Sequence, residues 1–279
     1  MFFLYFVMFY YLFYTTKMLY FAAMAFYPKS NPKPIDTTQL IYGQHAILEA
    51  LLAAKDINKV IVQQTAKSEI INEILKKCKQ QDIPIQYAPK EKFAFLQQKN
   101  HQGVMAYLSP IAFQKIEDII PQLFDEGKTP FILILDRITD VRNLGAIARS
   151  AYCAGVHAIV IPAADNAPIN EDAVKTSAGA LMHIPICREK NYKTVLELLN
   201  QSGVLTIACT EKAKKNFHEI DLTVPVAIIM GNEETGISPE ILKKCEEMAK
   251  IPLELGVQSL NVSVAAGIAV YETVRQRIS

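Results

Sequence analysis

The sequence predicts an α/β fold, in which a mostly parallel sheet follows a smaller α/β domain. From residue 129 onward, short β-branched runs alternate with amphipathic stretches; residues 131–135 (FILIL) and 224–230 (VPVAIIM) are two such runs. Apolar residues make up 51% of the 279 residues, which suits a sheet that is buried on both faces. The length allows one large domain or two ordinary ones.

Charge and cysteine content limit the classes of partner and compartment. The formal net charge is only +1, so an anionic partner must be met by local basic patches and not by a global field. The cysteines are odd in number, scattered and without a CxxC pair: Cys78, Cys153, Cys187, Cys209 and Cys245. This pattern predicts reduced thiols in a cytoplasmic protein and argues against a disulfide framework or a zinc site.

The first 35 residues differ from the rest of the chain. Residues 1–27 carry a single charge, Lys17, among aromatic and aliphatic residues, and a Pro-rich link at 28–34 follows. The stretch is long enough for a membrane helix, but the positive region and cleavage site of a secretory signal are poorly developed. We favour a leader that is not native, with Met18 and Met24 as internal starts, over a membrane anchor.

Alternating helix and strand patterns predict a small α/β domain at residues 36–110. Apolar spacing predicts helices at 43–55, 68–80 and 91–98, and strands at 59–63, 83–87 and 104–108. Residues 111–128 predict a connecting helix that is interrupted at Pro121, and we take this segment as the linker to a second domain at 129–279.

The second domain alternates strand and helix throughout. Strands are expected at 131–135, 157–161, 184–187, 204–209 and 224–230. Helices are expected to end near Gly155, to span 170–177 and 192–201, and to run from a Ser238 cap to 244. The chain closes with an apolar strand from Ile251, a loop at Gly256 and a helix that begins near Ser259, a candidate N-cap.

Three strand-to-helix junctions carry the polar residues of a candidate ligand site: 136–149, 231–236 and 251–263. A doubly wound sheet binds its ligand beyond the carboxyl ends of its strands, where such junctions gather. Neither a dinucleotide nor a P-loop fingerprint is present. The pattern alone indicates an α/β domain with an unusual ligand loop; the alternative is a buried helix whose polar side chains satisfy nearby backbone.

The same junctions resemble the three signature motifs of the SpoU (TrmH) branch of the SPOUT methyltransferases. The motifs read Asn143-x-Gly145-x-x-x-Arg149, Gly231-x-Glu233-x-x-Gly236, and Ile251-Pro252 followed by Ser259-Leu260-Asn261-Val262-Ser263. The resemblance covers about residues 40–277. It includes Tyr42-Gly43 and His101-Gln102-Gly103-Val104, which are typical of members with an extra N-terminal domain. Val141-Arg142 departs from the family, which often has Pro followed by His there.

The resemblance implies a SPOUT-type parallel sheet with a C-terminal trefoil knot, preceded by a ribosomal-protein-like RNA-binding domain. It also implies S-adenosyl-L-methionine as cofactor, no metal, and a homodimer formed through the last helix. The cofactor would be held mainly by main chain at Gly231, Ile251 and Leu260. We therefore expect Gly231→Val to block the cofactor while leaving the fold intact.

The resemblance assigns catalysis to five side chains. Arg149 would bind the RNA phosphate and assist loss of the hydroxyl proton; whether it also serves literally as the base stays open, because a guanidinium is a poor isolated base. The other four would position the reacting groups: Asn143, Glu233, Ser259 and Asn261. The alternative for each is that it caps a helix or hydrogen-bonds the backbone of a loop. Asn143 and Arg149 are expected to face one pocket from the same helix.

The expected function is transfer of a methyl group to a ribose 2′-OH, closest to the 23S rRNA guanosine-2′-O-methyltransferases. A tRNA ribose methyltransferase and a non-catalytic RNA-binding protein of this fold are the alternatives. Lysine clusters at 76–79, 212–215 and 243–244 are either phosphate-binding patches or solvated faces.

Overall fold

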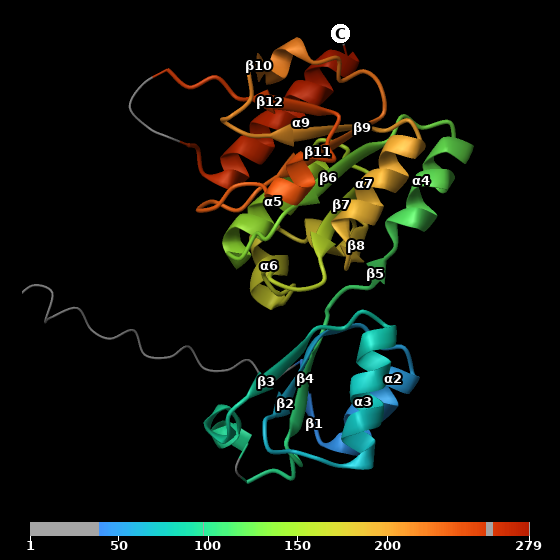
Figure 1. Ribbon diagram of the computed structural model, residues 1–279, viewed down its shortest axis with the longest axis vertical. Coiled ribbons are helices and arrows are strands. Elements are labelled where there is room, and N and C mark those ends of the chain that lie inside the picture. The colour runs from blue at the N-terminus through green and yellow to red at the C-terminus, as the bar shows by residue number, and fades with distance from the viewer. Residues whose placement is uncertain (1–38, 97, 255–258, 279) are drawn as a thin grey trace, which may run out of the picture. The chain divides into compact units, whose positions relative to one another are not determined.

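The computed structural model describes residues 39–96, 98–254 and 259–278 (Figure 1). The predicted leader, the Pro-rich link and Gly256 lie outside these residues. Within them, no helix is both long and apolar enough to cross a membrane.

The N-terminal domain is built on a sheet that, in the part of the chain described, has four strands in the order β1-β4-β2-β3. The strands are β1 (Leu40–Tyr42), β2 (Ile57–Gln63), β3 (Ile85–Ala88) and β4 (Val104–Leu108). β4 runs antiparallel to both β1 and β2, whereas β3 is parallel to β2. The helices α2 (Gln44–Leu52) and α3 (Glu69–Gln80) lie together on one face of this sheet (Figure 1).

Both faces of this sheet bury apolar side chains. Val60 and Val62 of β2 pack with the helices α2 and α3, whereas Ile61 packs on the opposite face. There it meets Phe93 and Leu96 of the 3₁₀ helix η1 (Lys90–Leu96). The alternation along β2 therefore fixes which residues of the strand face α2 and α3 and which face η1.

Most predicted elements of this domain are confirmed within a few residues. The expected helix at 91–98 is instead 3₁₀. The prediction omitted β1, because three residues give too little periodicity to recognise a strand. Gly43 precedes α2 with φ of 92°, a conformation that favours glycine over every other residue.

The C-terminal domain contains, among the described residues, a sheet of eight strands in the order β10-β12-β9-β11-β6-β7-β8-β5. Each pairing in it is parallel. The strands are β5 (Phe113–Gln114), β6 (Phe131–Leu135), β7 (Ala158–Pro162), β8 (Ile186–Glu189), β9 (Leu205–Cys209), β10 (Lys215–Asn216), β11 (Val226–Met230) and β12 (Glu247–Lys250). All five residues of β6 and of β11 are buried, as expected of central parallel strands.

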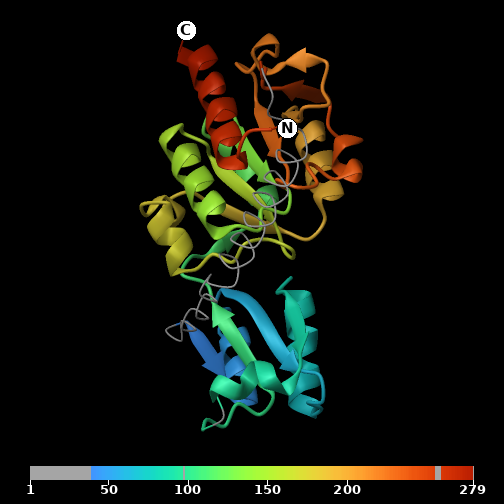
Figure 2. The same ribbon diagram turned by 90° about the vertical axis from the view of Figure 1, so that its left-hand side faces the viewer.

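Helices cover both faces of this sheet (Figures 1 and 2). One core contains side chains of α4 (Ile116–Asp125), α7 (Tyr192–Gln201) and α8 (Pro239–Leu242). The other contains side chains of α5 (Val141–Cys153), α6 (Glu171–Thr176) and α9 (Val262–Ile278), with the short 3₁₀ helices η2 (Ala180–Met182) and η3 (Phe217–Glu219). The sheet is therefore the middle layer of three.

Gly145 allows two of these helices to approach closely. A Cβ atom placed on Gly145 of α5 would lie 2.7 Å from Cβ of Thr176 and 2.9 Å from the carbonyl oxygen of Ala173, both on α6. Neither contact is tolerable, and the second involves backbone. The glycine of the first motif therefore has a packing role.

The expected interruption of the helix at Pro121 is wrong. α4 runs through Pro121, although an interior proline removes one backbone donor and crowds the carbonyl four residues earlier. Burial of the apolar face of α4 offsets this cost. Its apolar face (Ile116, Ile119, Ile120 and Leu123) packs in the core beneath the larger sheet. β5 and α4 both come from the segment predicted as a linker, and β5 pairs with β8 of that sheet.

The last strand and helix also differ from the prediction. The strand β12 ends at Lys250, just before the apolar run from Ile251, and α9 begins at Val262 and not near Ser259. Asn261 stands at the start of α9: its Oδ1 accepts the backbone N–H of Ser263 at 2.9 Å. The amide of Asn261 therefore serves as the cap that the sequence suggested for Ser259.

Candidate functional site

Three segments that are far apart in sequence meet where β6 and β11 end. Asn143 lies in the first turn of α5, Glu233 in the loop that follows β11, and Asn261 at the start of α9. Asn143 and Asn261 are 118 residues apart, yet Nδ2 of Asn261 donates to Oδ1 of Asn143 at 3.1 Å. The structure thus brings together one predicted residue from each of the three motifs.

Glu233 holds the two amides in one orientation. Its Oε1 accepts from Nδ2 of Asn143 and, at 3.1 Å, from Nδ2 of Asn261. Oδ1 of Asn261 in turn accepts from the backbone and hydroxyl of Ser263. Because the carboxylate can only accept, it fixes both amides with their donor groups toward it. The capping alternative holds for Asn261, which caps α9 as well as joining this cluster.

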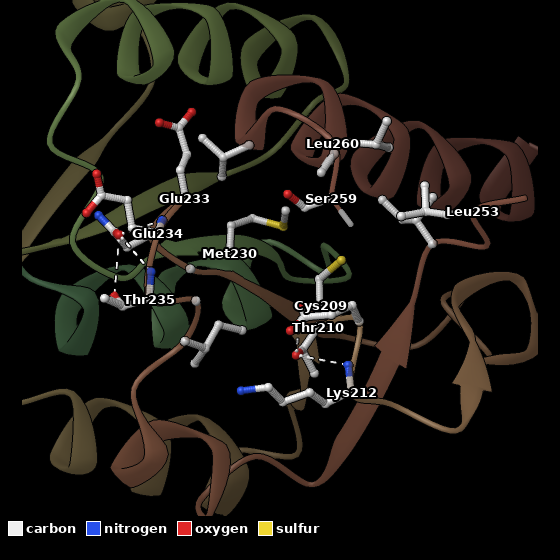
Figure 3. A pocket seen from close by; sticks show the side chains of 18 residues that line it. Cys209, Thr210, Lys212, Met230, Glu233, Glu234, Thr235, Leu253, Ser259 and Leu260 are labelled. Atoms are coloured by element: carbon white, nitrogen blue, oxygen red, sulfur yellow. Dashed lines mark hydrogen bonds between the residues drawn. The ribbon is translucent and has the colours of Figure 1, made fainter. Parts of the chain in front are cut away.

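Glu233 of this cluster lines a cavity of about 530 Å³, whereas Asn143 and Asn261 are not among its lining residues (Figure 3). The three predicted cofactor contacts, Gly231, Ile251 and Leu260, all line it, as do Glu233 and Ser259. Apolar side chains make up much of the wall, and charged, amide and hydroxyl side chains together with loop backbone provide the polar part. Its size and mixed lining are those of a small-molecule site, and they suit a flat base joined to a polar ribose and amino acid.

Gly231 is needed by the loop itself. A Cβ atom at Gly231 would lie 2.3 Å from the backbone nitrogen of Ile237 and 2.4 Å from the carbonyl carbon of Gly236. The loop doubles back onto its own first residue, so any side chain there must push the backbone apart. The expectation that Gly231→Val leaves the fold intact is therefore wrong.

A buried carboxylate hydrogen-bonds the end of the loop that follows β11. Asp136, which directly follows β6, is 4% exposed, and its Oδ2 accepts the backbone N–H of Ser238 at 2.7 Å. Arg137 donates to the same carboxylate and to the carbonyl of Gly236 at 3.2 Å. Hydrogen bonding to Asp136 raises the pKa of Arg137. Asp136 and Arg137 therefore fix both the end of the loop and the place of Glu233.

Sequence reasoning did not single out Asp136, Arg137 or Asn232. The amide of Asn232 donates to the carbonyl of Arg137 at 2.9 Å and completes the support of the loop. The signal was present, because a charged residue directly after five buried apolar residues needs a partner in the interior.

A fourth segment, at the end of β9 and just after it, also lines the cavity; the sequence singled out only its lysines, as a possible phosphate-binding patch. Cys209, Thr210 and Lys212 line the cavity opposite the loop that carries Glu233 (Figure 3). Burial raises the pKa of the Cys209 thiol to about 12, so it stays neutral and forms part of the apolar wall. All five cysteines are free thiols. Among the residues described, no group of three His, Cys, Asp or Glu side chains could hold a metal ion.

Arg149 does not share the surface of Asn143. It is exposed on α5, outside the residues that line the cavity. Six residues at 3.6 per turn correspond to about 600°, so the two side chains leave the helix roughly 120° apart. Neither Asn143 nor Arg149 is among the residues that line the cavity, so the expectation that both face one pocket stays a prediction.

Two family models match the chain. Residues 130–271 match the model described as SpoU rRNA Methylase family. Residues 40–114 match the model described as RNA 2′-O ribose methyltransferase substrate binding.

Relatives and solved structures extend over nearly the whole described chain. A Staphylococcus saprophyticus protein, whose name assigns it to the TrmH family of tRNA/rRNA methyltransferases, is 35% identical over 238 residues, covering 85% of this chain and 96% of that protein. A Staphylococcus aureus protein of the same name is 34% identical with the same coverage.

The SpoU methyltransferase AviRb of Streptomyces viridochromogenes, solved with AdoMet, has a TM-score of 0.55 at 22% identity, over 89% of this chain and 95% of that one. An AdoMet-bound rRNA methyltransferase of Sinorhizobium meliloti has a TM-score of 0.55 at 23% identity, over 88% and 90%. At these identities the two structures support the fold.

Asp136→Asn tests the support of the loop. We expect it to lower the free energy of unfolding by about 2 kcal/mol, because a buried hydrogen-bonded charge beside Arg137 is lost. Chemical denaturation measures this. Asp140→Asn is the matched control: Asp140 caps α5 on the surface, where asparagine caps equally well, so a change below about 0.5 kcal/mol is expected. Equal losses in both variants would contradict the proposed role of Asp136.

Proposed function

The chain belongs to the SpoU (TrmH) family of RNA methyltransferases. We propose that it methylates the ribose 2′-OH of a guanosine in 23S rRNA. The observation that carries this proposal is the polar cluster of Asn143, Glu233 and Asn261, whose Glu233 lines the cavity. A small-molecule cavity next to fixed amides and a carboxylate suits a reaction between a bound cofactor and a hydroxyl group from outside.

S-adenosyl-L-methionine is the methyl donor, and when bound it supplies a methyl group activated by the positive sulfonium. Backbone at Gly231, Ile251 and Leu260 would hold it, with the apolar wall around the base. Ser259 lines the same cavity and would contact the methionine part or the incoming ribose. The amides that Glu233 orients would hold the ribose hydroxyl in line with the methyl group.

Arg149 would bind the phosphate of the target nucleotide. Its guanidinium is always charged and can grip a phosphate oxygen with two donors. It lies on an exposed side of α5, where an extended RNA can reach it. Binding the phosphate would hold the ribose over the cluster and assist departure of the hydroxyl proton.

The match of residues 40–114 to a substrate-binding domain supports rRNA as the substrate, because folded rRNA presents loops to a second binding surface. A tRNA is the alternative, since the Staphylococcus relatives are named for both classes of RNA. Free thiols at all five cysteines suit a cytoplasmic location, where these RNAs are found. A non-catalytic role is less favoured, because the cluster is complete.

The C-terminal segment would thread as a trefoil knot. This proposal is supported by the cavity lining: Ile251, Leu253, Ser259 and Leu260 border the same cavity as the loop after β11, and α9 then packs against α5. Chain segments that meet in this way must pass close to one another before the helix begins.

A homodimer through α9 is supported by an exposed apolar stripe. Val264, Ile268 and Tyr271 are 49%, 43% and 50% exposed, and their spacing places them on one side of the helix. Tyr152 on α5, the helix packed against α9, is also exposed. Exposed apolar side chains on two helices that pack together are typical of a protein interface.

The substrate can be tested by mapping 2′-O-methyl groups in rRNA and tRNA, with and without this gene, in the cell that carries it. We expect one guanosine of 23S rRNA to lose its methyl group in the deletion strain and to regain it when the gene is restored. Loss confined to tRNA would replace the proposed substrate, and unchanged RNA would remove the proposed activity.

Arg149→Ala and Arg149→Lys should each lower methyl transfer by two orders of magnitude or more, equivalent to roughly 3 kcal/mol. Lysine keeps the charge but loses the planar pair of donors. Cofactor affinity should change little, since Arg149 lies outside the cavity. Single-turnover assays and calorimetric titration separate the two effects. Arg142→Ala, another exposed arginine of α5, should keep activity within about threefold. Full activity in the lysine variant would rule out the two-donor role.

Ile268→Lys should convert the dimer to a monomer, because it places a charge within the apolar stripe of α9. Size-exclusion chromatography with light scattering measures the mass. Phe124→Lys is the control, since Phe124 is similarly exposed, at 41%, but lies on α4 against the other face of the sheet. A wild-type monomer, or a dimer that persists in the Ile268 variant, would contradict the proposed interface.

A further inference from the structure

Lysine ammonium groups lie over tyrosine rings on the N-terminal sheet. Nζ of Lys59, on β2, lies 5.5 Å from the ring centre of Tyr107, on β4. Nζ of Lys99, just before β4, lies 5.2 Å from the ring centre of Tyr42, on β1. A cation at this distance is attracted by the face of the ring. The rings therefore restrict where the two ammonium groups point.

These lysines belong to the sheet face opposite α2 and α3. Lys59 is two residues from Ile61, which packs on that face with η1, and strand residues two apart share a face. Tyr42 and Tyr107 pack against the same cluster as Ile61. Lys92 adds a third ammonium group from η1 itself. The three lysines thus come from three separate segments that converge on one face.

Carboxylates of the described residues leave the three lysines of this face without an ion pair. Lys59 is half-buried, and its pKa is lowered by burial and then by the positive charge of Lys92. Among the residues that the structure describes, no carboxylate forms an ion pair with Lys59, Lys92 or Lys99. Lys215 and Lys244 of the other basic clusters are paired with Glu247 and Glu197. Lys76, Lys77 and Lys79 on α3, like the three lysines of the sheet face, form no ion pair with a described carboxylate, so the tyrosine rings and the convergence of three segments distinguish the sheet face.

We propose that this face is the RNA-contact surface of the N-terminal domain, with Lys59, Lys92 and Lys99 bound to successive phosphates of the substrate RNA. The proposal rests on the proposed function. A polyanion complements a group of unpaired ammonium ions, and each contact releases a counterion from the RNA. Because rings hold two of the three lysines, less side-chain freedom is lost on binding than for lysines free in water. The lysines at 76–79 lie on α3, against the opposite face.

The test is RNA binding by the full chain in which Lys59, Lys92 and Lys99 are all replaced by glutamine. The probes are an unmodified 23S rRNA transcript and an unmodified tRNA transcript, titrated between about 50 and 200 mM salt. We expect affinity for the bound RNA to fall on the order of 30-fold at about 0.1 M salt. The slope of log affinity against log salt should fall by about 2, since each single-strand phosphate contact contributes about 0.7.

The matched control replaces Lys76, Lys77 and Lys79 with glutamine, which removes the same charge from α3. Its salt slope should stay within about 0.5 of the wild type, because those lysines would make no phosphate contact. If this control lost as much RNA affinity as the variant with Lys59, Lys92 and Lys99 replaced by glutamine (the sheet-face variant), the effect would be one of overall charge, and the proposal would be overturned. So would wild-type binding by the sheet-face variant.

Two further variants distinguish the loss of phosphate contacts from misfolding of the chain. Lys92→Gln with Lys99→Gln changes only exposed residues, and it should lose about two-thirds of the salt-slope effect while keeping the wild-type melting temperature. Arginine at all three positions keeps the charge and should restore the slope. Lost binding with arginine, in a chain that melts normally, would overturn the proposal.

Methylation assays separate this proposal from the proposed function. The sheet-face variant should show a raised KM for RNA with kcat within about twofold of the wild type, and unchanged cofactor affinity. If the wild type binds RNA through these lysines but adds no 2′-O-methyl group, the proposed function fails and the surface stands. If it methylates rRNA while the sheet-face variant keeps the wild-type KM, the surface fails and the function stands.

Discussion

The loop from Gly231 to Gly236 can take its observed path only because its first residue has no side chain. The backbone of Gly236 and Ile237 occupies the space that a Cβ atom of Gly231 would need. This return brings Glu233 to the two asparagines and turns the loop backbone toward the cavity. Buried Asp136 then holds the loop end through Ser238. The polar cluster and the cavity wall thus depend on one close backbone approach.

Local charge determines what this nearly neutral chain can bind. Its net charge of +1 gives no long-range attraction for a polyanion. Lys59, Lys92 and Lys99 instead gather on one sheet face, and Arg149 stands exposed on α5. Many other lysines are neutralised by nearby carboxylates, as Lys193 is by Glu240. Such an arrangement favours binding at defined points over general attraction.

The sequence predicted the central sheet better than its edges. Strands β6 and β11 stood out because five consecutive buried residues are apolar in each. The two-residue strands β5 and β10 have no periodicity, since they exist only because a neighbouring strand offers its edge. The alternation of strands and helices placed Asn143, Glu233 and Asn261 after the ends of strands. Only the resemblance to the family assigned the three residues to one site. The start of α9 was misplaced because Ser259 and Asn261 are both good caps.

The departure at Val141-Arg142 shows how the site tolerates change beside it. Asp140 accepts the backbone N–H groups of Arg142 and Asn143, so α5 begins at residue 141 without help from proline. Proline favours this first helical position because its φ is already helical and its missing N–H is not needed there. The aspartate cap supplies the same start through a hydrogen bond. Asn143 therefore keeps its place in the first turn, where Glu233 reaches it. The geometry of the cluster depends on where the helix begins, and not on which residue begins it.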